Sequence, residues 1–298
     1  MRVLKKSAST VSGMLSLLLS LAPASCVRED TEGCMQYELN VRAVDAQGND
    51  LTRTGALQKA DVYLFGEKGF VRMVPAGTSS DFLFGHDRSE RLTLVAWGNL
   101  KEDTLITTEI TRGTTIAEAR LKLKEHARGN HLPLTDLFYC RKELNNAATR
   151  GMREETLTLV MERMAAGLSI RTRYLAERYP YEGKPYTFIV RGTGTEVDFT
   201  GKIEGEGAGY RPLSLTDEKG DVYAPPFRIF PTAAGECIEI DIYREQERIC
   251  TVSRDNDFKP LCAPAGKQTN IEIDFRYAEI RAFVNVLPWG EVNQDAEM

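Results

Sequence analysis

Histidine and long apolar runs are both scarce in this chain. Its 298 residues include only three histidines, His86, His126 and His131, which leaves few ligands for a metal centre and few candidates for a catalytic base. After Ala22 no apolar run approaches the roughly 20 residues that a membrane-spanning helix needs. No stretch is conspicuously basic, and acidic residues outnumber basic ones by 43 to 38. These absences argue against a polytopic membrane protein and a nucleic-acid-binding protein.

Motifs of enzymes are missing as well. The chain contains no G-x-x-x-x-G-K-[ST], H-E-x-x-H or G-x-S-x-G motif, and no C-x-x-C pair that would indicate a zinc ribbon or a thioredoxin-like site. Acidic pairs such as Glu102-Asp103 and Glu154-Glu155 have nothing beside them that marks an acid–base dyad. We therefore predict that the protein is not an enzyme and uses neither a cofactor nor a metal ion.

What the chain does have is an N-terminal export signal. Three basic residues among the first six precede an uncharged, leucine-rich segment from Val11 to Ala22, and small residues follow. This order is typical of a secretory signal peptide, and an apolar core of about 12 residues is too short to span a bilayer. We predict a signal peptide over residues 1–25, whose removal takes the formal charge from −5 to −8.

Cys26 follows the small residues Ala24 and Ser25. A cysteine at this junction is typical of a bacterial lipoprotein, in which the thiol takes a diacylglycerol and the new N-terminal amine is acylated. Two or three acyl chains would anchor the protein stably. Pro23 stands where that motif usually has leucine, so ordinary secretory cleavage near Ala24 is the alternative. We predict lipidation at Cys26.

A lipidated tether is expected over residues 26–36. Its acidic residues Glu29, Asp30 and Glu32 resemble the surface-export signal of Bacteroidota lipoproteins, although a solvated spacer would have the same composition. The five other cysteines are Cys34, Cys140, Cys237, Cys250 and Cys262. An odd number cannot all pair within one chain, and their spacing leaves the connectivity open. We expect them to be structural.

The rest of the chain reads mostly as short strands. From Tyr37 to Ala43 apolar and polar residues alternate with a period of two, the pattern of a half-buried strand. Similar runs bounded by turn residues predict further strands at 62–65, 92–97, 157–161, 186–190, 196–203, 226–230, 237–243, 248–253, 269–275 and 280–287. Residues 115–125 suit either a short helix or a strand, and the polar stretch 141–153 predicts a loop. We predict an all-β protein with two β-sandwich domains in tandem, over 37–153 and 154–298.

Five motifs occur in an order that resembles one known family. They are CVREDTEGC at 26–34, VYLF at 62–65, VAWGN at 95–99, FRIFPT at 227–232 and VNVLPW at 284–289. Together they are similar to the fimbrial anchor family of Bacteroidota, the fimbrillin-B-like lipoproteins of type V pili. The resemblance spans nearly the whole chain after the signal peptide.

The resemblance implies two transthyretin-like β-sandwich domains in tandem, no catalysis, and a surface role that holds the base of a fimbria on the outer membrane and limits its length. In such pili each subunit donates its C-terminal strand to an open groove in its neighbour, by β-strand addition. Stalk subunits open that groove when an Arg-specific protease removes their first strand. The implied partners are a fimbrial stalk subunit and the outer-membrane lipid, with no nucleic acid.

The position of the lipid constrains an anchor further. The strand from Tyr37 to Ala43 lies within about 20 residues of Cys26, so a cut after it, for example at Arg53, would release the body from its lipid. An anchor must therefore keep its first strand. Because that strand continues to fill the groove, the anchor can donate a strand to a neighbour but cannot accept one.

The predicted donor strand is 280–287, with one face formed by Ile280, Ala282, Val284 and Val286. The alternative is that this segment is simply the last core strand, which Pro288 would end.

Two other functions fit the same export signal and fold class. A surface glycan-binding lipoprotein would expose aromatic side chains beside polar groups, but Trp97 and Trp289 both lie in or beside strand-like runs where we expect core packing. A stalk or tip fimbrillin is the nearer alternative, and a cut at an arginine after the first strand would favour it.

Overall fold

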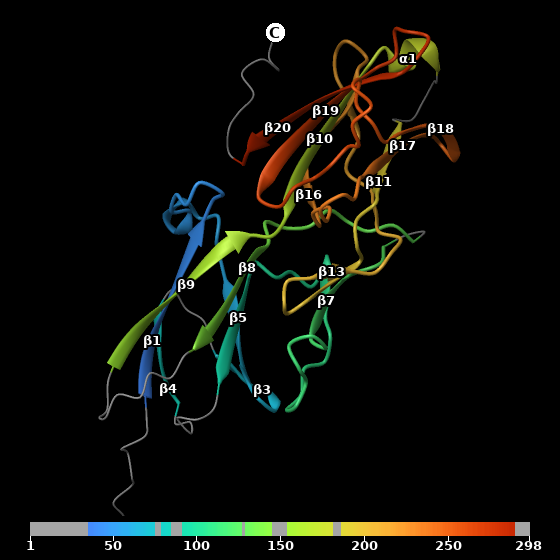
Figure 1. The fold of residues 1–298 in the computed structure, drawn as a ribbon. Coiled ribbons are helices and arrows are strands. Elements are labelled where there is room, and N and C mark those ends of the chain that lie inside the picture. The colour runs from blue at the N-terminus through green and yellow to red at the C-terminus, as the bar shows by residue number, and fades with distance from the viewer. Residues whose placement is uncertain are drawn as a thin grey trace, which may run out of the picture.

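The computed structural model describes residues 35–74, 79–84, 91–126, 129–144, 154–180 and 186–289. These residues are mostly β, with one short helix, α1 (Leu175–Arg178), and one 3₁₀ turn (Thr52–Thr54). The predicted all-β class is confirmed in this coarse form. The strands form four sheets in two lobes that follow one another along an elongated molecule (Figure 1).

The larger sheet of the first lobe has seven strands in the order β3-β2-β5-β8-β9-β1-β4. They are β1 (Met35–Val44), β2 (Ala60–Gly66), β3 (Gly69–Val74), β4 (Ser79–Phe84), β5 (Leu92–Gly98), β8 (Phe138–Leu144) and β9 (Glu154–Arg163). β1 pairs parallel with β9 and antiparallel with β4. The first strand therefore lies between two hydrogen-bonded neighbours, and the strand predicted from Tyr37 to Ala43 is confirmed.

A smaller sheet faces the seven-stranded one, with the order β13-β12-β7-β6. Its strands are β6 (Leu105–Thr107), β7 (Arg120–Leu123), β12 (Glu196–Asp198) and β13 (Ile203–Glu204). Trp97 is fully buried between the two sheets, with its ring centroid 5.7 Å from that of Phe199. The predicted core role of Trp97 is confirmed.

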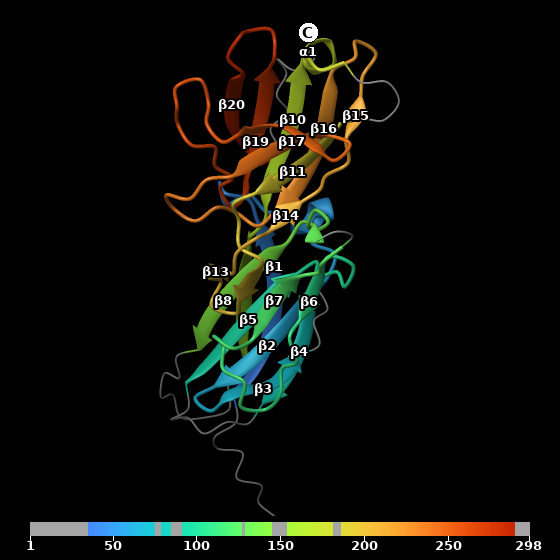
Figure 2. The ribbon, with the colours of Figure 1, turned by 90° about the vertical axis from the view of Figure 1, so that its right-hand side faces the viewer.

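The second lobe holds the two remaining sheets. A five-stranded sheet has the order β15-β16-β10-β19-β20, and a four-stranded sheet has the order β14-β11-β17-β18. The first comprises β10 (Ala166–Arg173), β15 (Leu215–Thr216), β16 (Val222–Ile229), β19 (Lys267–Asp274) and β20 (Arg281–Pro288). The second comprises β11 (Thr187–Arg191), β14 (Gly209–Tyr210), β17 (Glu239–Arg244) and β18 (Glu247–Val252). Figure 2 shows one sheet in front of the other.

Two apolar clusters stabilise this arrangement. Every fully buried member of the smaller cluster, such as Leu39, Leu94 and Leu159, comes from the seven-stranded sheet. That sheet must therefore curve so that one of its faces packs against itself. The larger cluster begins between the two sheets of the first lobe and continues into the second lobe, where Phe188, Ile240 and their neighbours fill the interior. Burial of these side chains, at about 25 cal/mol per Å² of apolar surface, is the main stabilising contribution.

The strand β8 replaces part of a predicted loop. The loop prediction for 141–153 is wrong over residues 141–144, which belong to β8 and pair with β5. Arg141 and Glu143 are exposed and form an ion pair at 3.0 Å, so their charges reach water while the backbone completes the sheet. Residues 145–153 lie outside the described part. The segment 115–125, left open as helix or strand, contains β7.

The hydrogen-bonding pattern crosses the boundary predicted at residue 154. β9 pairs with β1 in the first lobe over nine residue pairs from Gln36–Glu154 to Val44–Glu162. β12, which follows the first strands of the second lobe in sequence, returns to pair with β7. The two lobes are therefore interlocked rather than consecutive in the chain.

Candidate assembly site

The predicted donor strand is an edge strand of the second lobe. β20 pairs antiparallel with β19, from Lys267–Pro288 to Asp274–Arg281, and ends the strand order of its sheet. Among the described residues no strand pairs with its other side, where Ala282 O accepts one loop hydrogen bond from Asn256 N at 2.9 Å. A free strand edge of this kind is a template for pairing with another chain.

The predicted face of β20 is only partly buried. Ala282 is 2% exposed and belongs to the core, and Ile280 and Val284 pack against it while half-buried. Val286 is 39% exposed, so the apolar face ends before the strand does. The structure brings the first three residues together on the core side. The donor role of all four stays a prediction.

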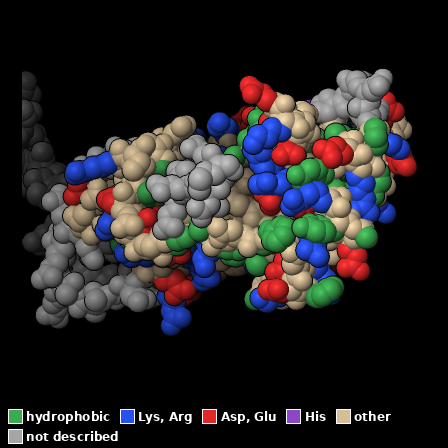
Figure 3. Space-filling model, turned by 90° about the horizontal axis from the view of Figure 1, so that it is seen from above, with side chains coloured by type: hydrophobic (Ala, Val, Ile, Leu, Met, Phe, Trp, Pro, Cys, Tyr) green, Lys and Arg blue, Asp and Glu red, His purple; other side chains and the backbone are tan. Residues whose placement is uncertain are grey.

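The start of β20 is braced by arginine side chains. The guanidinium carbon of Arg281 lies 3.9 Å from the ring centroid of Tyr277, and Arg178 donates to Tyr277 O at 2.6 Å. Arg276 bonds the carboxylate of Asp274 at 3.0 Å, which lowers the pKa of Asp274 although burial opposes the shift. Figure 3, which looks down on this end of the molecule, shows basic, acidic and hydrophobic side chains intermixed. The described surface at this end of the molecule therefore carries no patch of a single charge sign.

The end of β20 leads into Trp289, for which the core-packing prediction is wrong. Trp289 is half-buried and lies outside both apolar clusters. Its ring is instead flanked by the guanidinium groups of Arg163 and Arg228. These arginines come from β9 and β16, so sequence reasoning about the C-terminal motif alone could not identify them.

Arg53 lies in the exposed 3₁₀ turn just after β1. The turn is hydrogen-bonded back onto the strand, since Leu51 N donates to Ala43 O at 2.8 Å and Ala43 N donates to the Thr52 hydroxyl at 2.9 Å. Asp50 accepts from Thr52 N at 2.8 Å, and this bond lowers the pKa of Asp50. The candidate cleavage position therefore lies in an ordered turn.

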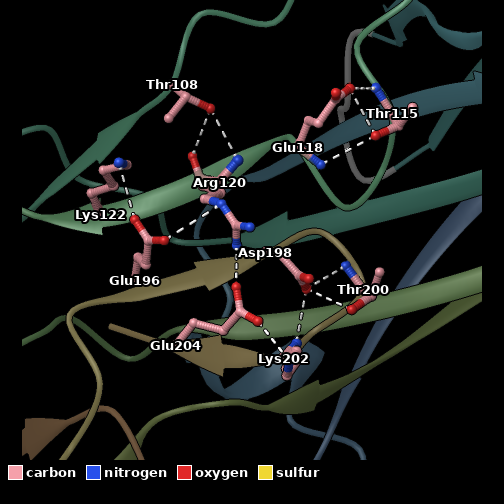
Figure 4. Close-up of polar contacts among 10 residues, drawn as sticks. All are labelled: Thr108, Thr115, Glu118, Arg120, Lys122, Glu196, Asp198, Thr200, Lys202 and Glu204. Atoms are coloured by element: carbon pink, nitrogen blue, oxygen red, sulfur yellow. Dashed lines mark hydrogen bonds and ion pairs between the residues drawn. The ribbon is translucent and has the colours of Figure 1, made fainter. Parts of the chain in front are cut away.

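A cluster of charged residues joins β7 to β12 and β13 (Figure 4). Arg120 lies 2.8 Å from Glu204 and 3.5 Å from Glu196, and Glu196 also pairs with Lys122 at 3.1 Å. The Lys202 side chain bonds Glu204 and lowers the pKa of that carboxyl. Each glutamate is paired with at least one basic side chain, so the cluster is a structural cross-link between distant segments of the chain.

The described histidines hold no metal centre. Among the described residues no group of three or more His, Cys, Asp or Glu side chains could hold a metal ion. His131 is buried, its Nδ1 accepts from Gly209 N at 3.3 Å, and burial lowers its pKa against the opposing charge of Glu125. His126 is exposed, and His86 lies outside the described residues.

The described cysteines are all unpaired: Cys140, Cys237, Cys250 and Cys262. Burial raises the pKa of Cys140 and of Cys250 to about 11, so both are held as thiols. The predicted lipidation residue Cys26 and its neighbour Cys34 lie outside the described residues. In the part of the chain that is described, no helix is long and apolar enough to cross a membrane.

The described residues thus form a two-lobed β protein whose last strand has a free edge, a feature suited to pairing with another chain. The model of one family, the fimbrillin-A associated anchor proteins Mfa1 and Mfa2, matches residues 31–295. The chain belongs to this family. Membership confirms the resemblance to fimbrial anchors drawn from the sequence, and it confirms that the protein is structural rather than an enzyme.

Individual relatives agree with the family. The major fimbrium anchoring subunit FimB of Porphyromonas gingivalis strain W83 is 26% identical over 299 residues, which cover 96% of this chain and 97% of FimB. The solved fimbrial anchor protein Mfa2 from Porphyromonas gingivalis has a TM-score of 0.61 at 12% identity, covering 86% of this chain and 98% of Mfa2. A candidate polysaccharide-binding protein from Bacteroides thetaiotaomicron has a TM-score of 0.63 at 14% identity, covering 87% and 100%. The two structural matches establish the fold alone.

Proposed function

We propose that this chain is the anchoring subunit of a fimbria. It is held in the outer membrane by acyl chains on Cys26, stands at the cell surface, and joins the adjacent stalk subunit through β20. Its relative FimB is a fimbrium anchoring subunit, and the structurally similar Mfa2 is a fimbrial anchor protein. The sequence similarity to FimB extends over 96% of the chain.

The observation that carries the proposal is the contrast between the two terminal strands. β1 is paired on both sides within its sheet, whereas β20 is paired on one side only. The two strands also lie in opposite lobes (Figure 1). A subunit that keeps its first strand and offers its last one can bind a single neighbour, so growth ends at this subunit and fimbrial length is limited.

The finer fold assignment belongs to the same proposal. We take each lobe to be a transthyretin-like β-sandwich, the two lying in tandem. Because β9 pairs with β1 and β8, the pairings favour a division between Arg163 and Ala166. Residues 196–204 then return to complete the first lobe.

Intact mass spectrometry of the protein extracted from outer membranes tests the anchor role. We expect a mass that begins at Cys26 and includes two or three acyl chains. A mass beginning near Thr54 without lipid would contradict the anchor role and indicate a processed stalk or tip subunit.

Strand donation is tested separately by deleting residues 280–298 in cells that make fimbriae. We expect fimbriae to detach into the medium or to grow beyond their normal length. Deleting only residues 290–298 is the matched control, because it keeps β20 and Trp289, and it should leave attachment unchanged. Normal attachment and length in the longer deletion, with the protein present at its usual level, would remove the donor role.

The glycan-binding alternative has less support. Trp97 is fully buried and is not available to stack on a sugar ring, and the likeness to the Bacteroides thetaiotaomicron protein concerns the fold. Failure of the mature protein to be retained by immobilised surface polysaccharides would agree with the anchor role.

A further inference from the structure

Trp289 lies in a seat formed by residues from both lobes. The guanidinium carbon of Arg163 is 4.5 Å from the centroid of its ring, and that of Arg228 is 5.3 Å away. Both distances lie within the range of a cation–π interaction, for which tryptophan is the strongest aromatic partner. We use the name Trp289 seat for Asp136, Arg163, Gly167, Arg228 and Gln268.

The seat is fixed by contacts that do not involve Trp289. Arg163 Nε and Nη2 donate to the two carboxylate oxygens of Asp136 at 2.6 and 2.8 Å, and the arginine side chain is only 6% exposed. The backbone oxygen of Asp136 in turn accepts from Asn99 Nδ2 at 2.8 Å. A bidentate arginine–carboxylate pair fixes the guanidinium plane, so the surface that meets the ring is oriented in advance.

Gly167 supplies the space for the ring. A Cβ atom at this position would lie 2.7 Å from Trp289 Cζ3, 3.0 Å from Trp289 Cη2 and 2.2 Å from Gln268 Oε1. Gly167 lies inside β10 and does not have the positive φ that favours glycine, so the close approach of the ring explains the missing side chain. Glycine inside a strand often marks such an approach.

Other contacts hold β20 more strongly at its start than at its end. Near the start, Ala282 is buried, Asn256 bonds its carbonyl, and Arg281 stacks on Tyr277. Towards the end, Val286 is 39% exposed, and the ladder to β19 is the remaining backbone contact. The Trp289 seat therefore lies where the strand has the least apolar burial.

We propose that the Trp289 seat is a lock that keeps β20 in its own sheet, and that the strand leaves from its C-terminal end when the lock opens. The significance of release rests on the proposed donor role of β20. Arg163, which bonds Asp136, ends β9 of the first lobe, whereas Gly167 and Arg228 lie in β10 and β16 of the second. The lock thus also couples strand release to the contact between the lobes.

Hydrogen exchange on the mature protein without its lipid tests the lock directly. In Trp289→Ala the amides of β20 that bond to β19 should exchange about tenfold faster or more, while those of β10 and β16 stay unchanged. Trp289→Phe keeps an aromatic face and should restore part of the protection. Unchanged exchange in β20 of Trp289→Ala would overturn the lock.

Gly167→Ala provides an independent variant, because it should push the ring out without removing it. It should speed exchange in β20 as Trp289→Ala does, and the double variant should exchange no faster than Trp289→Ala alone. Gly209→Ala is the matched control in the same lobe, since its Cβ would meet other atoms only at 3.4 Å or more. Additive effects in the double variant, or wild-type exchange in Gly167→Ala, would contradict the lock.

These measurements are separate from the test of strand donation. Faster exchange in β20 supports the lock even if the 280–298 deletion leaves fimbriae attached, in which case the donor role alone fails. Unchanged hydrogen exchange in β20 contradicts the proposed lock, even if that deletion detaches the fimbriae.

Discussion

β1 and β20, the first and last strands of the protein, are held in different ways. β1 has neighbours on both sides and contributes Leu39, 1% exposed, to the interior of its sheet. β20 has one neighbour, and Ala282 is its one residue in the core cluster. The difference supports the proposed asymmetry, in which the anchor keeps its N-terminal strand and releases its C-terminal strand.

The largest expected change in the free energy of unfolding comes from a substitution in β1. Leu39→Ala should lower the free energy of unfolding by about 3 kcal/mol, because a fully buried leucine is replaced and a cavity remains. Chemical denaturation followed by circular dichroism measures it. A loss below about 1 kcal/mol would show that β1 is held no more tightly than an edge strand.

A matched truncation on β20 should cost less. Val284→Ala removes methyl groups that are half-buried, so we expect about 1 kcal/mol at roughly 0.8 kcal/mol for each fully buried CH₂. The same denaturation experiment applies. Because Leu39 and Val284 lie in different lobes, the double variant should lose the sum of the two free energies. If Val284→Ala alone cost as much as Leu39→Ala, the two strands would be held equally firmly and the comparison would fail.

Acid should loosen the region where β20 begins. The Arg276 side chain holds the pKa of Asp274 below its ordinary value, so this carboxylate stabilises the fold above about pH 4 and its contribution is lost as the pH falls through the lowered pKa. The denaturation midpoint of wild type should fall between pH 7 and pH 3, and the fall should be smaller in Asp274→Asn. Equal pH dependence in both proteins would contradict this role.

The smallest expected effect concerns His131, which links the loop before β8 to Gly209 of the second lobe. Burial lowers its pKa, so the folded state favours the neutral ring, and its contribution to stability is present above about pH 6.5 and lost as the pH falls below that value. His131→Asn should flatten the stability profile between pH 7 and pH 5. A profile identical to that of wild type would exclude this role.

Much of the strand content could be predicted because period-two alternation is a local property. The strands around Leu39, Leu94 and Ile240 can each be predicted from a few residues of local sequence. β8 was missed because its exposed side is charged, and its strand character comes from pairing with β5. Pairing partners that are far apart in the sequence leave no mark on local composition.

The Trp289 seat could not be predicted from the sequence for the same reason. Its residues come from positions 136 to 268, and the pairing of β10 with β16 and β19 places Arg228 and Gln268 beside Gly167. Gly167, inside β10, indicates that another group approaches closely, but it does not identify that group. Lipidation at Cys26 remains a prediction from sequence.

The parallel pairing of β1 with β9 has a mechanical consequence. β1 enters at the end of the molecule far from the second lobe and runs towards it, in the same direction as β9 (Figure 1). A pull on the N-terminal end of β1 along the long axis therefore acts along the strand, across hydrogen bonds that bridge it sideways to β9 and β4. The bonds share that load as a shear instead of opening one after another, so under tension the end of the protein that carries β1 should outlast the end that carries β20.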